Sequence, residues 1–246
     1  MKALLLSFTT MAVLLVLGSG TVSADTIDVV SDSWPPYVFE DNGCIAGTDY
    51  ETVKAVLEGM GHQLRLTFYP WKRCIAMVED GSADALMDAG KTQQREKTLI
   101  FPKEPLSSSQ TVLFHMKGRL FVFRSLADLK GLKVGTQLGY SYSDEFNQAR
   151  GFIKEPVESV EINIRKLLYG RIDLFMANRN FGLFEAQRMG VSDQIDHLQE
   201  TISSGDVYLA FSRKSPKNAL AVEFAKALKQ FKKTDRYRAI LKKYGQ

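Results

Sequence analysis

The chain has 246 residues, 45% of them hydrophobic, and a formal net charge of +4. Its apolar content is ordinary for a globular protein. Much of the positive charge lies in the last two predicted helices, where such a run usually marks a solvated helix face, so we expect no nucleic-acid partner. These residues are Lys226, Lys229, Lys232, Lys233, Lys242 and Lys243.

The N-terminus has the pattern of a secretory signal peptide over residues 1–24. Lys2 gives a short positive start, Ala3 to Leu17 is almost entirely apolar, and Val22-Ser23-Ala24 supplies small residues for cleavage. An uncleaved membrane anchor is the alternative. No cysteine lies near the cleavage site, so we expect an exported, periplasmic protein that is not a lipoprotein. About 222 residues then remain, enough for one large or two modest domains.

The first half of the mature chain predicts the order β-α-β-α-β. Trp34-Pro35-Pro36-Tyr37 stops the first strand in an extended loop. Asp49 can cap the first helix, which Gly61 closes, and Pro70-Trp71 opens the second. The predicted strands are Thr26–Ser31, Gln63–Tyr69 and Asp84–Met87.

The second half predicts the same order, followed by a further strand and two amphipathic helices. No low-complexity linker separates the two halves. The predicted strands are Thr111–Met116, Lys133–Gln137, a short one, Asp173–Met176 and Val207–Phe211. The predicted helices are Ser141–Arg150 and Ser159–Tyr169, then two with apolar residues at helical spacing, the first with Leu220, Phe224, Leu228 and Phe231 and the second with Tyr237, Ile240, Leu241 and Tyr244.

One short phrase occurs twice with the same internal spacing. Gly81-Ser-Ala-Asp84-Ala-Leu-Met87 matches Gly170-Arg-Ile-Asp173-Leu-Phe-Met176. Each copy predicts a helix, a glycine that ends it in a left-handed turn, a buried strand and an exposed strand tip. Open α/β sheets place ligands at such tips. Two copies therefore indicate two similar lobes that face each other across a cleft.

The strands near Thr111–Phe114 and Val207–Phe211 are the expected crossing points between the lobes, and two crossing strands make a hinge. We assign residues 25–112 plus 207–246 to lobe 1 and residues 113–206 to lobe 2. The fold class predicted is α/β with a ligand cleft between the lobes.

Enzyme signatures are absent from the sequence. It has no glycine-rich phosphate loop, nucleophile elbow or paired-histidine zinc motif. His62, His115 and His197 share no ligand spacing. We therefore expect no metal site, no cofactor and no catalytic activity.

Several polar and aromatic residues are candidates for a ligand site. Arg95, with Thr92 and nearby amides, can hold a carboxylate at the first strand tip, although a solvated basic turn is the alternative. Trp34, Tyr37 and Trp71 lie at loop and helix starts, where aromatic walls hold small polar ligands, but each can equally be a core residue.

A second polar segment lies between a strand and a helix start in the second half. It contains Tyr140, Ser141 and Tyr142, whose amides and hydroxyls would face the first-lobe site across the cleft. Ser141 can also serve as a helix N-cap.

The chain has two cysteines, Cys44 and Cys74. An even count in an exported protein favours a disulfide, with two free thiols as the alternative.

These features together resemble the extracellular solute-binding proteins of family 3, the polar amino-acid group of ABC-transporter binding proteins. The resemblance covers essentially the whole mature chain. It implies two α/β lobes of the type II periplasmic-binding-protein fold, joined by two crossing strands. The residues that carry it are Trp34-Pro-Pro-Tyr37, Gly47-Thr-Asp49, Gly81-x-x-Asp84, Thr92-x-x-Arg95, Leu129-Lys-Gly131-x-x-Val134-Gly135 and Gly170-Arg-Ile-Asp173.

The resemblance also implies roles for the candidate residues. Arg95 would clamp a ligand carboxylate with help from the Thr92 region, and Trp34 and Trp71 would line the side-chain pocket. Tyr140, Ser141 and Tyr142 would supply contacts from the second lobe. Trp71-Lys-Arg73-Cys74 with Cys44 is similar to a cysteine-bearing subgroup, which supports the disulfide.

Two departures from the family pattern leave the ligand open. Asn178 stands where amino-acid binders carry an aspartate for the ligand's ammonium, and a neutral amide cannot neutralise a buried charge. The interval from Asp84 to Thr92 also looks one residue short. Asp88 could supply the missing negative charge from the opposite lobe, or the ligand lacks an α-amino group.

The function expected is that of a monomeric periplasmic binding protein for a small carboxylate-bearing solute. It would close its lobes on the solute and deliver it to an ABC transporter permease. A sensor read by a membrane receptor needs only the same closure, and a few relatives with this fold act as dehydratases.

Overall fold

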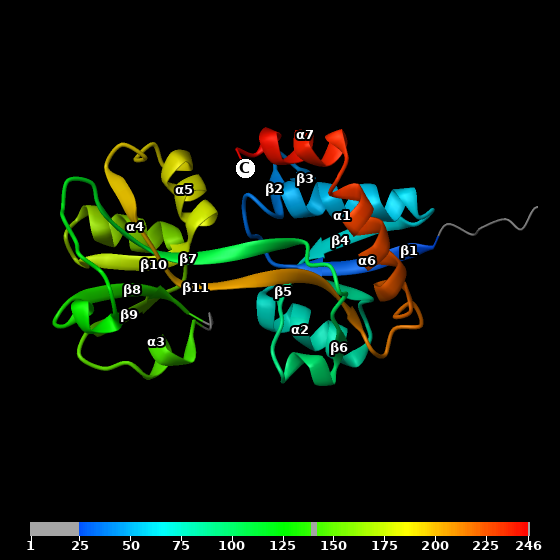
Figure 1. The fold of residues 1–246 in the computed structure, drawn as a ribbon, viewed down its shortest axis with the longest axis horizontal. Helices are drawn as coiled ribbons and strands as arrows, with labels where there is room; N and C mark the ends of the chain where they lie inside the picture. Colours follow the sequence, from blue (N-terminus) through cyan, green and yellow to red (C-terminus); the bar gives the residue numbers. More distant parts are fainter. Residues whose placement is uncertain (1–24, 139–141, 246) are drawn as a thin grey trace, which may run out of the picture.

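The computed structural model describes residues 25–138 and 142–245. The predicted signal peptide (residues 1–24) lies outside the described residues, as do Tyr140 and Ser141. Two lobes lie side by side and are joined by two long strands (Figure 1). Across the described ranges, no helix combines the length and apolar character needed to cross a membrane.

One sheet runs through both lobes, in the strand order β4-β1-β5-β11-β7-β10-β8-β9, with β6 added beside β11. Lobe 1 holds β1 (Thr26–Ser31), β4 (Gln63–Phe68), β5 (Ala85–Gly90) and β6 (Leu99–Ile100). Lobe 2 holds β8 (Lys133–Gln137), β9 (Ile153–Val157) and β10 (Leu174–Asn178). A separate hairpin of β2 (Phe39–Asp41) and β3 (Cys44–Ala46) lies on lobe 1.

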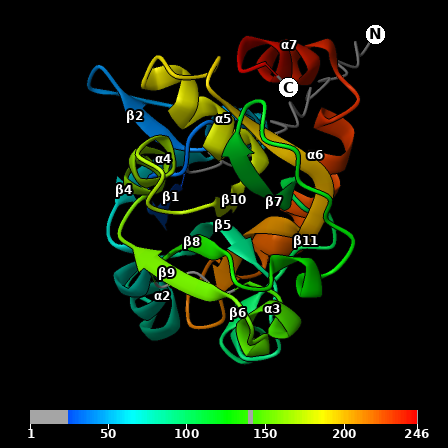
Figure 2. The same cartoon turned by 90° about the vertical axis from the view of Figure 1, so that its left-hand side faces the viewer.

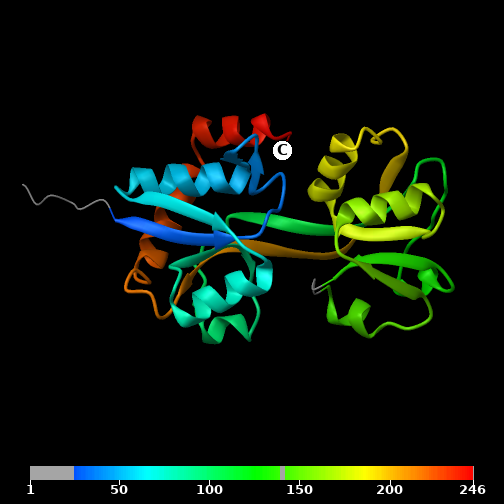
Figure 3. The same ribbon diagram turned by 180° about the vertical axis from the view of Figure 1, so that it is seen from behind.

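Helices cover both faces of the sheet in each lobe (Figures 1 and 3). Those of lobe 1 are α1 (Thr48–Gly59), α2 (Trp71–Asp80), α6 (Leu220–Phe231) and α7 (Asp235–Lys243). Those of lobe 2 are α3 (Asp144–Gln148), α4 (Val160–Leu168) and α5 (Arg179–Arg188). Side chains alternate along each strand, so β5 sends Ala85 and Met87 into one hydrophobic core and Leu86 into another on the opposite face.

The joining strands are β7 (Ser107–Met116) and β11 (Ile195–Ser212), and they pair antiparallel with each other along most of their length. β11 also pairs with β5 of lobe 1, and β7 also pairs with β10 of lobe 2. Figure 2 shows the pair end-on, behind lobe 2. The two-lobed α/β fold with crossing strands is thus confirmed. Because both strands are continuous, the exact lobe boundaries at 112/113 and 206/207 remain our proposal.

The aspartate of the repeated phrase makes the same two hydrogen bonds in each lobe. The Asp84 carboxylate accepts a hydrogen bond from Asp28 N at 2.9 Å, while Asp84 N donates to Asp28 O. Asp173 makes the same two contacts with Lys133, also at 2.9 Å for the carboxylate. Each aspartate therefore fixes the start of its strand to the neighbouring parallel strand, β1 or β8.

The strand tips lie further along than the repeat suggested. Met87 and Met176 are fully buried, and the strands continue to Gly90 and Asn178. Gly81 and Gly170 have left-handed backbones, with φ of 89° and 63°, as expected for residues that end helices.

Two local predictions differ from the structure, and one helix was missed. Gly47, not Asp49, precedes α1, and Asp49 is buried in the first turn. The helix predicted from Ser141 to Arg150 is the short α3, capped by Ser143, whose hydroxyl accepts from Phe146 N at 3.2 Å. Helix α5 was not predicted at all, because its apolar residues form no stripe at helical spacing.

The predicted Cys44–Cys74 disulfide is also wrong, since both cysteines are free. Cys44 is exposed at the start of β3, whereas Cys74 is buried in α2, where its thiol donates to Tyr69 O at 3.3 Å. The sheet of lobe 1 separates the hairpin from α2 (Figure 1). An even number of cysteines does not predict on which side of the sheet each cysteine lies.

We predict that only Cys44 reacts with a thiol reagent in the native protein. Burial raises the pKa of the Cys74 thiol to about 11, which keeps it protonated and unreactive at neutral pH. Titration with a coloured disulfide reagent should count one thiol in buffer and two in denaturant. A mass that rises on reduction of the purified protein would contradict this account.

Candidate functional site

A cleft of about 540 Å³ lies between the lobes on one side of β7 and β11. We call it the front cleft. It brings together residues from both halves of the chain, at the carboxyl ends of parallel strands, where α/β sheets usually bind ligands. The predicted residues that line it are Trp34, Trp71, Asp88, Thr92, Arg95, Tyr142 and Asn178.

Arg95 is the prominent cation of the front cleft. Its backbone N–H donates to Thr92 Oγ1 at 3.2 Å, and its Nη1 donates to Gly90 O at 2.7 Å. The guanidinium lies 5.4 Å from the centre of the Trp71 ring. Burial lowers the pKa of Arg95. The neighbouring Lys91 is instead paired with Glu96 at 2.8 Å.

Among the described residues no carboxylate forms an ion pair with Arg95. A partly buried guanidinium without an acidic partner keeps donors free for a planar anion, and a carboxylate fits this fork bidentately. The arrangement can therefore hold a carboxylate.

The aromatic candidates divide between two sides of the molecule. Trp34 and Trp71 line the front cleft. Tyr37 is buried against Trp34, with ring centres 4.4 Å apart, but it lines a different cavity.

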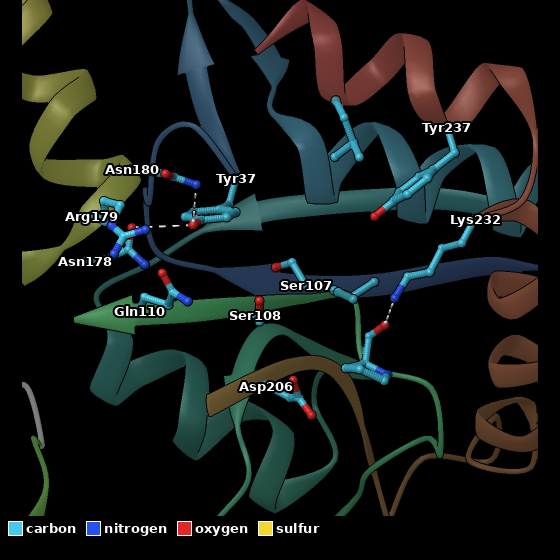
Figure 4. A pocket seen from close by; sticks show the side chains of 13 residues that line it. Tyr37, Ser107, Ser108, Gln110, Asn178, Arg179, Asn180, Asp206, Lys232 and Tyr237 are labelled. Atoms are coloured by element: carbon cyan, nitrogen blue, oxygen red, sulfur yellow. Dashed lines mark hydrogen bonds between the residues drawn. The ribbon is translucent and has the colours of Figure 1, made fainter. Parts of the chain in front are cut away.

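That second cavity, which we call the back cavity, has a volume of about 560 Å³ and lies on the opposite face of the hinge strands. Alternation along β7 explains the division, since Ser109 and Thr111 line the front cleft while Ser108 and Gln110 line the back cavity. In Figure 4, Asn178, Arg179 and Asn180 lie at one end, and Lys232 and Tyr237 at the other.

Asn178 connects the two lobes. Its Oδ1 accepts from Phe181 N at 2.9 Å, which caps α5, and from the Tyr37 hydroxyl at 3.4 Å. Its Nδ2 donates to Ser109 Oγ at 3.0 Å, and Asn180 Nδ2 donates to the Tyr37 hydroxyl at 3.1 Å. We call these contacts of Tyr37 the back tether. The Asn178 amide oxygen is thus already occupied within the protein.

Two further acids line the front cleft that sequence reasoning missed. Asp32 directly follows β1, and burial raises its pKa to about 6. Asp206 is exposed on β11. The position of Asp32 at the end of a predicted parallel strand was a usable signal, whereas Asp206 lies within a strand whose length was underestimated.

The wall from lobe 2 is built by Gln137, Tyr142 and Ser143. The Tyr142 hydroxyl accepts from Gln137 N at 3.0 Å, and burial raises the pKa of Tyr142. The neighbouring candidates Tyr140 and Ser141 lie outside the described residues.

Asp88 differs from the other acids of the cleft because its carboxyl is buried. Only 7% of the residue is exposed, and its backbone is left-handed with φ of 58°. Its side chain meets that of Asp49. It therefore does not present a free charge to the cleft in this conformation.

Comparisons with known proteins agree with this architecture. A probable amino-acid-binding protein of Bacillus subtilis (strain 168), YxeM, is 22% identical over 248 residues, which cover 95% of this chain and 90% of that protein. Among solved structures, an ancestral arginine-binding protein bound to arginine has 26% identity and a TM-score of 0.72, covering 89% of this chain and 97% of that one.

A histidine kinase sensor domain with similarity to periplasmic binding proteins has 22% identity and a TM-score of 0.73, covering 90% of this chain and 96% of that one. The sequence model of the bacterial extracellular solute-binding proteins, family 3, matches residues 27–246. The chain belongs to this family.

Proposed function

We propose that this chain is a periplasmic binding protein that captures an amino acid or a related carboxylate-bearing solute and delivers it to an ABC transporter permease. The observation that carries this proposal is Arg95, which lies in the cleft beside Trp71 without an acidic partner among the described residues. The names of two similar proteins, an amino-acid-binding protein and an arginine-binding protein, support the solute class.

The charges of the front cleft suit a zwitterion. Arg95 supplies the positive charge, and Asp32 and Asp206 supply negative charges. An ammonium or guanidinium beside Asp32 would favour its ionised form and offset the effect of burial on its pKa. In this proposal Asp32 and Asp206 take the role that Asn178 cannot, because the amide oxygen of Asn178 is held by α5 and Tyr37.

Closure of the lobes completes the site. Gln137 and Ser143 come from lobe 2, whereas Trp71 and Arg95 come from lobe 1, so a ligand that bonds both sets holds the lobes together. Movement about two hinge strands is a common way to close on a ligand. A permease can then recognise the closed, loaded form.

A sensory role is the second candidate, favoured by the similarity to a histidine kinase sensor domain. Both roles need the same closure and differ only in the membrane protein that reads it. Uptake of a radiolabelled amino acid into vesicles that contain a permease separates them, because only a transport partner moves the solute. We propose no catalytic activity, and we expect the solute to be recovered unchanged after prolonged incubation with the protein.

We predict that Arg95→Ala lowers the affinity for the solute by roughly 100-fold, because hydrogen bonds to a charged group are worth about 1.5–3 kcal/mol. A thermal-shift panel of amino acids, opines, dicarboxylates and cationic amines identifies the compound, since saturation at about 100 times Kd stabilises by about 2.7 kcal/mol. Calorimetry then measures the loss.

Arg73→Ala is the matched control, because Arg73 is an exposed arginine on the same helix as Trp71, stacked at 4.3 Å on Tyr69. It should bind like the wild type. Full affinity in Arg95→Ala would overturn the carboxylate clamp.

A second prediction concerns the back tether. Closing the front cleft separates the lobes on the opposite side of the hinge, so hydrogen bonds there oppose closure. Tyr37→Phe removes the hydroxyl that contacts Asn178 and Asn180, and we expect it to raise solute affinity about fivefold, equivalent to about 1 kcal/mol.

Tyr244→Phe is the control for this measurement. The Tyr244 hydroxyl donates to Glu51 and accepts from Gly47 N, all within lobe 1. Its removal should leave the affinity unchanged. If Tyr37→Phe binds no better than Tyr244→Phe, the tether does not oppose closure.

A further inference from the structure

Two buried carboxyl groups, Asp49 and Asp88, face each other beneath the tip of β5. Asp49 is 4% exposed and Asp88 is 7% exposed. Asp49 comes from the first turn of α1, and Asp88 stands two residues before the end of β5. The two carboxyl groups lie close enough for each to act on the pKa of the other.

A break in the strand pairing turns Asp88 towards Asp49. Opposite β11, the register of β5 shifts between the pairs Ala210↔Leu86 and Tyr208↔Ala89. Such a bulge breaks the alternation of side chains, and Ala89 accordingly packs on the same face as Leu86. Asp88 occupies the bulge in a left-handed conformation, which short polar residues tolerate better than others.

The pair has few hydrogen-bond donors of its own. Ser107 Oγ donates to Asp49 Oδ2 at 2.6 Å. Within the described residues, neither Asp88 oxygen accepts a hydrogen bond from an amide or hydroxyl donor. Two ionised carboxylates in contact would repel in this buried setting, whereas one retained proton converts the contact into a hydrogen bond.

The surroundings do not neutralise the pair. In the described part of the chain, no lysine or arginine forms an ion pair with either acid. Lys232, which acts on Asp49 from a distance, is held by Glu104 at 3.1 Å and Pro105 O at 2.7 Å. The other titratable or charged groups around the pair are Asp32, Tyr37 and Tyr237, with Lys91, Arg95 and Asp206 along the adjoining cleft.

We propose that one proton shared by Asp49 and Asp88 positions the tip of β5, and through it Arg95, so that the front cleft is assembled only while the proton is held. The link is short, since Gly90 follows Asp88 by two residues and its carbonyl accepts from Arg95 Nη1 at 2.7 Å. On the other side, Asp49 is fixed to Ser107 at the start of hinge strand β7. Loss of the proton places two like charges together and separates the strand tip from α1.

The direction of the pH effect follows from the pKa values. Burial is the largest cause of the raised pKa of both acids, and the neighbouring charge of Asp49 adds to it for Asp88. A carboxyl whose folded pKa exceeds its unfolded value of about 4 stabilises the fold in acid and loses that contribution as pH rises through the folded value. This pair therefore stabilises the fold at low pH, where most other carboxyl groups destabilise it when they become protonated.

The test uses the ligand-free mature protein, so it does not depend on the proposed solute. The chain has two tryptophans, Trp34 and Trp71, and both line the front cleft. Their emission reports the position of Arg95 beside Trp71. Emission and melting temperature are measured from about pH 5 to 9 in the wild type, Asp88→Asn, Asp49→Asn and Asp32→Asn.

We expect the wild-type emission to change with rising pH, and Asp88→Asn to abolish the part of this change that persists in Asp32→Asn. Asparagine tolerates the left-handed backbone, and its amide can donate to Asp49 without a titrating proton. Asp88→Asn should also raise the melting temperature by about 3 °C or more at high pH and have little effect at low pH. Asp49→Asn should act alike and serves if Asp88→Asn does not fold.

Asp32→Asn is the control, because Asp32 also titrates near the cleft, with a pKa of about 6. It should keep the transition. A transition lost only in Asp32→Asn, or emission and melting profiles identical in the wild type and Asp88→Asn, would overturn the proposal. Neither outcome bears on whether Arg95 binds a carboxylate, which rests on the binding measurements above.

Discussion

Strands β7 and β11 pair with each other and with one further strand in each lobe, so neither lobe can turn without bending this pair. Their alternating side chains face two separate cavities, one in front and one behind. In the closure that we propose, bending of this pair narrows the front cleft and widens the back cavity. Contacts in the back cavity therefore stabilise the open form, whereas solute contacts in the front cleft would stabilise the closed form. In our proposal the back tether of Tyr37 is the contact that opposes closure.

The same constraint gives Asn178 a structural role. It stands where β10 pairs with β7 and where α5 begins, and it touches both lobes at once. An amide can accept from Phe181 N and the Tyr37 hydroxyl with its oxygen while donating to Ser109 with its nitrogen. The negative charges of the cleft are found instead on Asp32 and Asp206.

The parts of this molecule that the sequence predicted are those set by local periodicity and repeats. The doubled Gly-x-x-Asp phrase predicted strands β5 and β10. The two copies share this pattern because each aspartate accepts a hydrogen bond from the neighbouring strand of its own lobe. Helix α5 was missed because it lacks an apolar stripe. The cysteine pairing was wrong because a count of two carries no information about which face of the sheet each thiol occupies.

The candidate site divides in the same way. Arg95, Thr92, Trp34 and Trp71 follow predicted strand ends or helix starts, and they meet in the front cleft. The facing of Asp49 and Asp88 depends on a bulge between β5 and β11, strands far apart in the chain. Tyr37 was a candidate ligand residue because it is a large aromatic side chain at a loop start, with a core role as the alternative, yet its hydroxyl bonds Asn178 and Asn180 behind the hinge.

The central claim is that Arg95 recognises a carboxylate, and a comparison of one amino acid with its carboxamide tests it most directly. Calorimetry measures both compounds on the wild type and on Arg95→Ala. We predict that the wild type binds the amino acid far more tightly than the carboxamide, and that Arg95→Ala binds both with similar, weak affinity. Equal binding of the two compounds by the wild type would contradict the account.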